Sequence, residues 1–266
     1  MDTTASQQER PDYGIDAPGV VRKLFLFGTV GLLVWASAAF GLWSGRLEIQ
    51  AGGVLVTFPL AGPGLGSGIA CLLIGSWMLW DSKAGKILGR ERLLGRLSWN
   101  GDEQVLDVGC GRGLMLIGAA RRLTTGKATG IDAWQKEDLS GNSPESALEN
   151  ARREGVADRV EVKTADMRRL PFADNSFDVV VSRAAIHNLY QPDERAQAIR
   201  EIARVLKPGG QAVIDDIRHL HEYTAVFSQH GCSEIERIGS PLVSALLMIV
   251  TLGSLRPATL LVRKSA

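Results

Sequence analysis

Short apolar runs and longer amphipathic segments alternate along the chain from about residue 105 onward. The apolar runs predict strands at 105–108, 128–131, 159–163, 178–182 and 211–215, and the segments between them predict helices at 114–123, 144–154 and 193–205. Two last strands are expected near Glu234–Gly239 and Ala258–Val262. This order is typical of an α/β fold with a doubly wound parallel sheet and helices on both faces. Such sheets bind ligands beyond the carboxyl ends of their strands.

The N-terminal part has a different pattern, with two long uncharged apolar runs. Leu24–Trp43 has twenty residues, and as a helix it spans about 30 Å, the thickness of a bilayer core. Prolines and glycines break the start of the second run, Val54–Trp80, so its helix is expected at about Gly64–Trp80. With Ser44–Gly53 as a short loop, the runs predict a transmembrane helical hairpin over 24–80. A buried hairpin of a soluble protein is the alternative.

The segments that flank the two runs carry the charge that predicts their orientation. Residues 1–23 are polar and are expected to form a disordered tail, and residues 81–99 a basic amphipathic linker helix ahead of a domain over 100–266. Basic residues lie on both outer flanks, whereas the connecting loop has only Arg46. The positive-inside bias therefore predicts a cell-membrane protein whose N-terminus and large domain face the cytoplasm.

Composition narrows the class of partner. The net charge is +1, and no basic stripe with interleaved aromatic residues occurs, so no nucleic-acid partner is expected. The three cysteines, Cys71, Cys110 and Cys232, form neither a disulfide framework nor a zinc-binding spacing. No metal is expected, and the sequence makes no prediction of oligomeric state.

The first strand leads into a glycine-rich turn. Val105–Gly113 reads Val-Leu-Asp-Val-Gly-Cys-Gly-Arg-Gly, which is a strand with an acidic residue near its end and then glycines at alternate positions. The dinucleotide pattern needs glycine where this chain has Leu114, so the turn favours a cofactor without phosphate, such as S-adenosylmethionine. Asp132 ends the next strand about twenty residues later, where an acidic side chain accepts hydrogen bonds from ribose hydroxyls.

Further segments follow in a recognisable order: Val160–Met167, Leu170–Phe172, Asn175–Ser182 and Leu206–Gly210. Together with the glycine turn they resemble the class I S-adenosylmethionine-dependent methyltransferases, most closely the subgroup that acts on small molecules and lipids. The resemblance covers roughly Leu97 to Ala266. It implies a Rossmann-like fold with an antiparallel last strand, methyltransferase activity and S-adenosylmethionine as cofactor.

The resemblance also implies roles for particular residues. Asp107 and the backbone of the glycine turn are expected to hold the methionine part of the cofactor, with helix capping as the alternative for Asp107. Asp166 is expected to accept from the adenine amino group while Met167 packs on the ring, unless Met167 is plain core. Trp134 either stacks near the adenine or anchors its loop. The expected cofactor-binding residues are Asp107, Gly109, Cys110, Gly111, Gly113, Asp132, Ala133, Trp134, Asp166, Met167, Ser182 and Arg183.

Histidines follow the fourth and fifth predicted strands, on the rim where an acceptor would bind. Methyl transfer needs alignment of the reacting atoms, and it needs a base only where the nucleophile loses a proton. The candidate catalytic residues are His187, Asp215, His219 and His221. His187 is the first choice, because the fourth strand is expected to open onto the transferred methyl group.

The sequence thus predicts a membrane-anchored methyltransferase for a small, lipophilic acceptor such as a quinone, isoprenoid, phenol or lipid amine. Two alternatives stay open: a small soluble or volatile nucleophile as acceptor, and a non-catalytic S-adenosylmethionine-binding membrane scaffold. The apolar stretch Pro241–Leu252 is too short to span a bilayer, and it belongs either to the core or to the membrane interface.

Overall fold

The chain folds into two compact units. The computed structural model describes residues 10–135, 138–240, 242, 247 and 255–266. Residues 14–85 and 136–140 form one unit, and residues 1–13, 86–135 and 141–266 form the other. Most of Pro241–Leu252, with its two predicted alternatives, lies outside the described residues.

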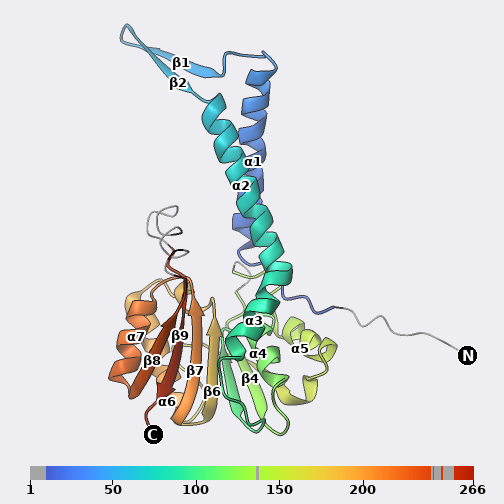
Figure 1. Cartoon of the computed structure of the whole chain (residues 1–266), viewed down its shortest axis with the longest axis vertical. Coiled ribbons are helices and arrows are strands. Elements are labelled where there is room, and N and C mark those ends of the chain that lie inside the picture. The colour runs from blue at the N-terminus through green and yellow to red at the C-terminus, as the bar shows by residue number, and fades with distance from the viewer. Residues whose placement is uncertain (1–9, 136–137, 241, 243–246, 248–254) are drawn as a thin grey trace, which may run out of the picture. The chain divides into compact units, whose positions relative to one another are not determined.

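The larger unit is built on a seven-stranded sheet with the order β5-β4-β3-β6-β7-β9-β8 (Figure 1). The strands are β3 Gln104–Val108, β4 Lys127–Asp132, β5 Val160–Thr164, β6 Phe177–Arg183, β7 Leu206–Asp216, β8 Cys232–Ile238 and β9 Ala258–Lys264. Strands β3 to β7 pair in parallel, whereas β9 is antiparallel to both β7 and β8. The predicted Rossmann-like fold with an antiparallel last strand is confirmed.

Helices cover both faces of this sheet. They are α3 Lys86–Leu94, α4 Leu114–Ala120, α5 Pro144–Arg153, α6 Pro192–Val205 and α7 Leu220–Gln229. Side chains of α3, α4 and α5 belong to one buried cluster, and those of α6 and α7 belong to the other. The sequence had not predicted α7, which begins at a polar, histidine-containing segment after β7.

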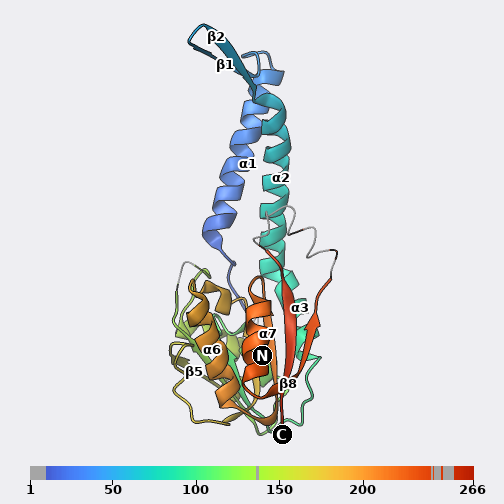
Figure 2. The same cartoon turned by 90° about the vertical axis from the view of Figure 1, so that its left-hand side faces the viewer.

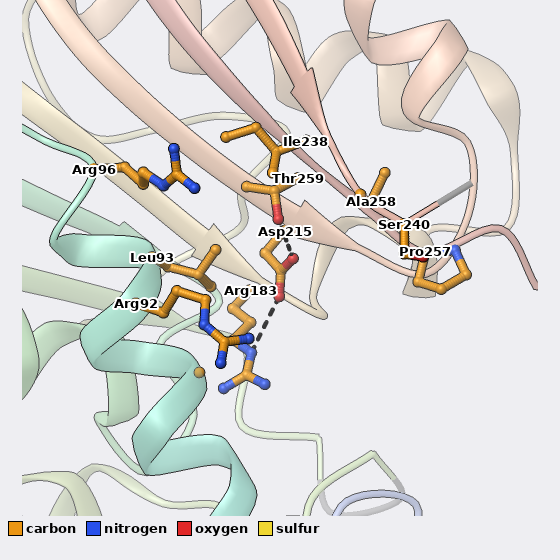
Figure 3. Close-up of a pocket in the computed structure, with 12 residues that line it drawn as sticks. Arg92, Leu93, Arg96, Arg183, Asp215, Ile238, Ser240, Pro257, Ala258 and Thr259 are labelled. Carbon is orange, nitrogen blue, oxygen red and sulfur yellow. Dashed lines mark hydrogen bonds and ion pairs between the residues drawn. The ribbon is translucent and has the colours of Figure 1, made fainter. Parts of the chain in front are cut away.

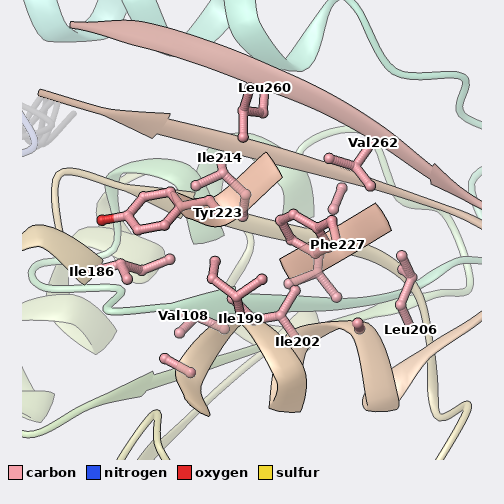
Figure 4. Close-up of a cluster of buried hydrophobic side chains, with 14 of the residues drawn as sticks. Val108, Ile186, Ile199, Ile202, Leu206, Ile214, Tyr223, Phe227, Leu260 and Val262 are labelled. Atoms are coloured by element: carbon pink, nitrogen blue, oxygen red, sulfur yellow. The ribbon is translucent and has the colours of Figure 1, made fainter. Parts of the chain in front are cut away.

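Side chains alternate between the two faces along each strand, and this alternation decides where the polar residues at the strand ends lie. On β7, Ala212 and Ile214 pack into the cluster that holds Tyr223 and Phe227 of α7 (Figure 4), whereas Val213 packs on the opposite face. The strand ends with two aspartates, Asp215 and Asp216. Continuing the alternation, Asp215 belongs to the α3 face and Asp216 to the α7 face.

An N-terminal segment packs onto the larger unit. Tyr13 is buried, its backbone carbonyl accepts from Lys86 Nζ at 3.0 Å, and its hydroxyl donates to Glu154. Arg90 donates to the Tyr13 hydroxyl at 3.0 Å and to Glu154 at 2.9 Å. Lys86 and Arg90, assigned from sequence to a basic linker, are therefore buried structural residues of this unit. Helix α1 begins at Pro18, so part of the expected tail 1–23 is helical.

The smaller unit is a helical pair joined by a β-hairpin (Figure 2). Its elements are α1 Pro18–Ala39, β1 Arg46–Ala51, β2 Val54–Pro59, α2 Ala61–Trp80 and a π-helical turn Asp81–Gly85. The expected loop Ser44–Gly53 is thus largely a strand, and the start of the second apolar run is its antiparallel partner. Gly52 and Gly53 both have positive φ, +57° and +83°, as a two-residue hairpin turn requires.

Helices α1 and α2 approach one another through glycines. A Cβ on Gly31 would lie 2.7 Å from the carbonyl oxygen of Gly64, and one on Gly68 would lie 3.0 Å from that of Gly28. The large side chains point outward instead, and many are more than half exposed: Leu26, Phe27, Leu33, Leu73 and Trp77. By length and apolar composition, two helices, Pro18–Ala39 and Ala61–Leu94, could cross a membrane.

Candidate functional site

The predicted glycine turn connects β3 to α4 at the carboxyl edge of the sheet. Gly109, Gly111 and Gly113 all have positive φ, at 76°, 51° and 87°. A Cβ on Gly109 would lie 2.2 Å from the Cβ of Ala185, so no larger residue fits there. The turn therefore adopts a backbone conformation that favours glycine, and these three positions have no side chain that would keep a ligand away from the backbone.

Asp107 lies beneath this turn and is almost fully buried. Its Oδ2 accepts from the backbone N–H of Leu116 at 2.8 Å, which is the capping role considered from sequence. Its Oδ1 has no hydrogen-bond partner within the described part of the chain. Burial raises the pKa of Asp107 to about 8, the Leu116 N–H opposes this, and the negative charge of Asp132 adds to it. An unpaired buried acceptor of this kind fits a cationic ligand group.

Asp132, at the end of β4, joins the turn to the loop that follows. Its Oδ2 accepts from the Gly111 N–H at 2.8 Å and its Oδ1 from the Trp134 N–H at 2.6 Å. The indole N–H of Trp134 donates to Thr164 at 2.8 Å, so Trp134 does anchor its loop. The side-chain amide of Asn142 also donates to Oδ1, at 3.3 Å. A carboxylate has about four acceptor sites, so Asp132 keeps about one of them for a ribose hydroxyl.

Three more of the predicted cofactor residues, Met167, Asp166 and Ser182, differ in burial and in hydrogen-bond partners. Met167 is half-buried, and its Cε lies 3.7 Å from a Cβ built on Gly109, which places it beside the turn. Asp166 forms an exposed ion pair with Arg168 at 2.7 Å, which lowers the pKa of Asp166. The Ser182 hydroxyl donates to the Val108 carbonyl at 2.7 Å and ties β6 to β3.

The side chains of two further predicted residues, Cys110 and Ala133, are not expected to make polar contacts with a cofactor. Cys110 is buried, which raises the pKa of its thiol. Ala133 is exposed.

His187 lies in a single 3₁₀ turn, Ile186–Asn188, directly after β6. Its Nδ1 is 2.5 Å from Oδ1 of Asp216, and its backbone N–H donates to Oδ2 of the same carboxylate at 3.1 Å. Asp216 is buried and also accepts from the hydroxyl of Tyr223 at 3.1 Å. The backbone N–H of Ile217 donates to Oδ1 at 2.8 Å as well. Four donors thus fix the carboxylate, and the carboxylate fixes the imidazole. With Nδ1–H donated to Asp216, Nε2 is left as the acceptor that a base needs.

The other three candidate catalytic residues do not share this arrangement. Asp215 lies on the opposite face, where it accepts from Arg183 at 3.2 Å. His219 pairs with Glu222 of α7 at 2.9 Å. His221 is exposed. The sequence therefore placed the four residues on one rim, whereas the structure joins only His187 to a buried carboxylate, and that carboxylate is Asp216.

A pocket of about 420 Å³ opens at the carboxyl ends of β6 and β7 (Figure 3). Its lining comes from α3, the ends of β6, β7 and β8, and the start of β9: Gly89, Arg92, Leu93, Arg96, Arg183, Asp215, Ile238, Gly239, Ser240, Pro257, Ala258 and Thr259. The sequence had assigned Arg183 to the cofactor site and had not singled out Arg92 or Arg96 as ligand contacts. No set of three or more metal-binding side chains occurs among the described residues.

Comparison with known proteins concerns this larger unit. Residues 106–214 match the family described as methyltransferase domain. The methyltransferase GfsG of Streptomyces halstedii is 40% identical over 127 residues, which are 48% of this chain and 42% of that protein. A demethylmenaquinone methyltransferase of Lactiplantibacillus plantarum is 35% identical over 125 residues, 47% of this chain and 49% of that protein. The chain thus spans about half or less of the length of these curated relatives.

A solved structure shares the fold. A geranyl diphosphate methyltransferase in complex with S-adenosylmethionine superimposes with a TM-score of 0.52 at 17% sequence identity. The match covers 68% of this chain and 85% of that one.

Proposed function

We propose that this chain, whose residues 106–214 form an S-adenosylmethionine-dependent methyltransferase domain, methylates a small lipophilic acceptor at a membrane. The proposal rests mainly on one observation: a glycine turn and a histidine–carboxylate pair lie at the same edge of the sheet. Asp107 lies in β3, ahead of the glycine turn, and its Oδ1 has no hydrogen-bond partner among the described residues. His187 follows the neighbouring β6 and pairs with Asp216 at the end of β7. Together they provide a cofactor cradle and a positioned base.

The residues of the cradle fit the cofactor's chemistry. Asp107 Oδ1 takes the ammonium group, and Asp132 accepts from the ribose with its remaining acceptor site. Asp166 accepts from the adenine amino group, while Met167 packs on the ring beside the glycine turn. When bound, S-adenosylmethionine supplies a methyl group on a positively charged sulfur, which a nucleophile attacks in line.

His187 then acts as the base that accepts a proton from the acceptor. With the cofactor bound, the acceptor atom would form its bond to the methyl carbon as the carbon–sulfur bond breaks, and sulfur would keep that electron pair. A hydroxyl or amine nucleophile loses its proton to Nε2 of His187, and the Asp216 carboxylate stabilises the resulting imidazolium. Tyr223 and the backbone hold Asp216 in place, so the imidazole keeps one orientation.

Support for a lipophilic acceptor comes from the names of the similar proteins. One acts as a demethylmenaquinone methyltransferase and another as a geranyl diphosphate methyltransferase, so quinone and isoprenoid chemistry is represented. For this chain we propose an acceptor from the same broad range: a quinone, an isoprenoid, a phenol or a lipid amine.

Membrane anchoring is proposed from the smaller unit. Its helices bury glycines against each other and expose leucine, phenylalanine and tryptophan, the reverse of a soluble helical pair. Such packing suits a lipid environment, because small residues allow close backbone approach while apolar side chains face the acyl chains. The distribution of basic residues favours a cytoplasmic domain.

The test is label transfer from methyl-labelled S-adenosylmethionine by membranes that contain the full chain. We expect the wild-type chain to transfer the label to a product in the organic extract. With His187→Ala, we expect the label to stay on S-adenosylmethionine. Label that stays in an aqueous product would point to a soluble acceptor. Cofactor binding with no transfer to any product would point to a non-catalytic scaffold.

A further inference from the structure

The pocket beside Asp215 has two chemically different walls. Arg92 lies in the last turn of α3, Arg96 lies in the turn that follows this helix, and Arg183 comes from the end of β6 (Figure 3). The opposite wall is mainly apolar. Ile238 ends β8, Pro257 immediately precedes β9 and Ala258 begins it, while Ser240 and Thr259 are polar. The proposed base and cofactor cradle account for none of these residues.

Arg183 is held in place from two sides. Its Nε donates to Asp215 Oδ2 at 3.2 Å, and its Nη1 donates to the backbone carbonyl of Lys86 at 3.1 Å. Asp215 is itself fixed by the hydroxyl of Thr259 at 2.6 Å. A Cβ built on Gly89 would lie 3.2 Å from Arg183 Nη2, so the guanidinium rests against a helix position that lacks a side chain. The Arg183 group is therefore preorganised at the pocket wall.

The pocket has an excess of positive charge. Asp215 offsets one arginine, Arg183. Arg92 and Arg96 are exposed, and within the ranges 10–135, 138–240 and 255–266 neither has an ion pair. Guanidinium groups with no carboxylate partner bind carboxylate and phosphate oxygens through paired N–H donors.

We propose that this pocket binds an anionic amphiphile, whose carboxylate or phosphate group lies on Arg92, Arg96 and Arg183 and whose apolar part lies on the β8–β9 wall. We further propose that this amphiphile is the methyl acceptor, and this part of the proposal rests on the proposed function. The link is topological: consecutive residues of β7, Asp215 and Asp216, hold Arg183 and His187 respectively. The anionic group is thus bound on one face of the sheet edge, and the base is held on the other.

Binding is measured by calorimetry on the full chain in a neutral detergent, with hexyl phosphate, hexanol and inorganic phosphate as probes. Hexyl phosphate is expected to bind at least about tenfold more tightly than either of the others, because only it contacts both walls. Equal affinity for hexyl phosphate and hexanol would overturn the proposal, since the arginines would then contribute nothing.

Amino-acid substitutions test whether hexyl phosphate binds in this pocket. Arg92→Gln/Arg96→Gln should weaken hexyl phosphate binding by about tenfold or more, the loss expected for charge-assisted hydrogen bonds. The control Lys127→Gln/Arg152→Gln removes the same charge from exposed positions on β4 and α5, and it should change affinity by less than about twofold. Equal losses in the two double variants would show a general charge effect and would rule out the pocket.

Gly89→Ala is the third variant, because its methyl group would push on Arg183 without removing charge. It should weaken hexyl phosphate binding while leaving S-adenosylmethionine affinity unchanged, which also shows that the domain is folded.

A kinetic experiment separates the acceptor from a membrane lipid as the source of the anion. If the acceptor occupies the pocket, hexyl phosphate inhibits methyl transfer competitively and Arg92→Gln/Arg96→Gln raises KM more than it lowers kcat. Binding without inhibition would assign the pocket to a lipid head group and would contradict its role in the acceptor site. Binding in a chain that transfers no methyl group would leave the anion pocket standing and would refute the proposed function alone.

Discussion

Asp107 has a structural role that is observed and a cofactor-binding role that we propose. One carboxylate oxygen caps α4 through Leu116, and the other is buried without a described partner. The sequence offered these roles as alternatives, and the capping contact is now observed. Burial, with the charge of Asp132, raises the pKa of Asp107 to about 8 despite the Leu116 N–H, so the free protein holds a proton here at neutral pH.

Binding of S-adenosylmethionine should therefore release a proton from Asp107. Because an ammonium partner favours the carboxylate form, affinity should rise by up to about tenfold per pH unit between pH 6 and 7.5, below the pKa of the ligand's own amino group, about 8. Calorimetry in buffers of different protonation enthalpy counts the released protons. Asp107→Asn is the control, and unchanged proton release in that variant would remove Asp107 from the cradle.

The same shift predicts a pH dependence of stability for the free protein. An unfolded aspartate has a pKa of about 3.9, whereas folded Asp107 keeps its proton up to about pH 8. The folded state then binds more protons over this window, so this residue's contribution to the free energy of unfolding falls as pH rises from about 4 to 8. Urea titrations from about pH 4 to 8 should show the free energy of unfolding of the wild type falling relative to that of Asp107→Asn. If the two proteins gave parallel profiles of this free energy against pH, the raised pKa of Asp107 would be wrong.

The His187–Asp216 pair predicts a split between binding and turnover. His187→Ala should lower turnover by roughly 10²–10⁴, the usual range for a positioned base, with S-adenosylmethionine affinity within about twofold of wild type. Asp216→Asn should also lower turnover, because the amide cannot stabilise an imidazolium. His221→Ala is the matched control at an exposed position. Full activity in His187→Ala would favour catalysis by alignment alone.

At the scale of elements, the sequence predicted the strands of the sheet well, for a physical reason. Buried parallel strands are continuous apolar runs, and β3, β4 and β6 have little exposed surface. Helix α7 was missed because its first turn is polar. The β1–β2 hairpin was missed because β1 lies in the segment expected to be a loop and β2 is the start of the second apolar run. The pocket could not be predicted, since it forms only where α3 meets the ends of strands far away in sequence.

The helical pair of the smaller unit predicts a position-specific effect of glycine substitution. Gly68→Leu should destabilise the pair by about 1–3 kcal/mol, because its side chain would enter the backbone of α1. Gly66→Leu is the control, since a Cβ there meets no atom within 4 Å. Thermal unfolding of the full chain in detergent compares the two. Equal effects would mean that α1 and α2 do not pack through this face.

At the scale of the whole molecule, the charge pattern predicts a membrane topology. Reporter fusions after Leu47 should appear on the far side of the membrane, and fusions after Asp81 should appear in the cytoplasm, because basic residues flank the outer ends of both helices. Release of the intact chain by carbonate washing would show that α1 and α2 do not span the bilayer.

In the proposed function, the cofactor cradle and the His187–Asp216 pair together methylate a lipophilic acceptor. The most direct measurement is the amount of S-adenosylhomocysteine formed by the purified full chain in detergent, with and without a lipid extract of its own membranes. We predict product only when the extract is present, and a loss of roughly 10²–10⁴ in rate with His187→Ala. Cofactor binding with no product in either condition would contradict the account.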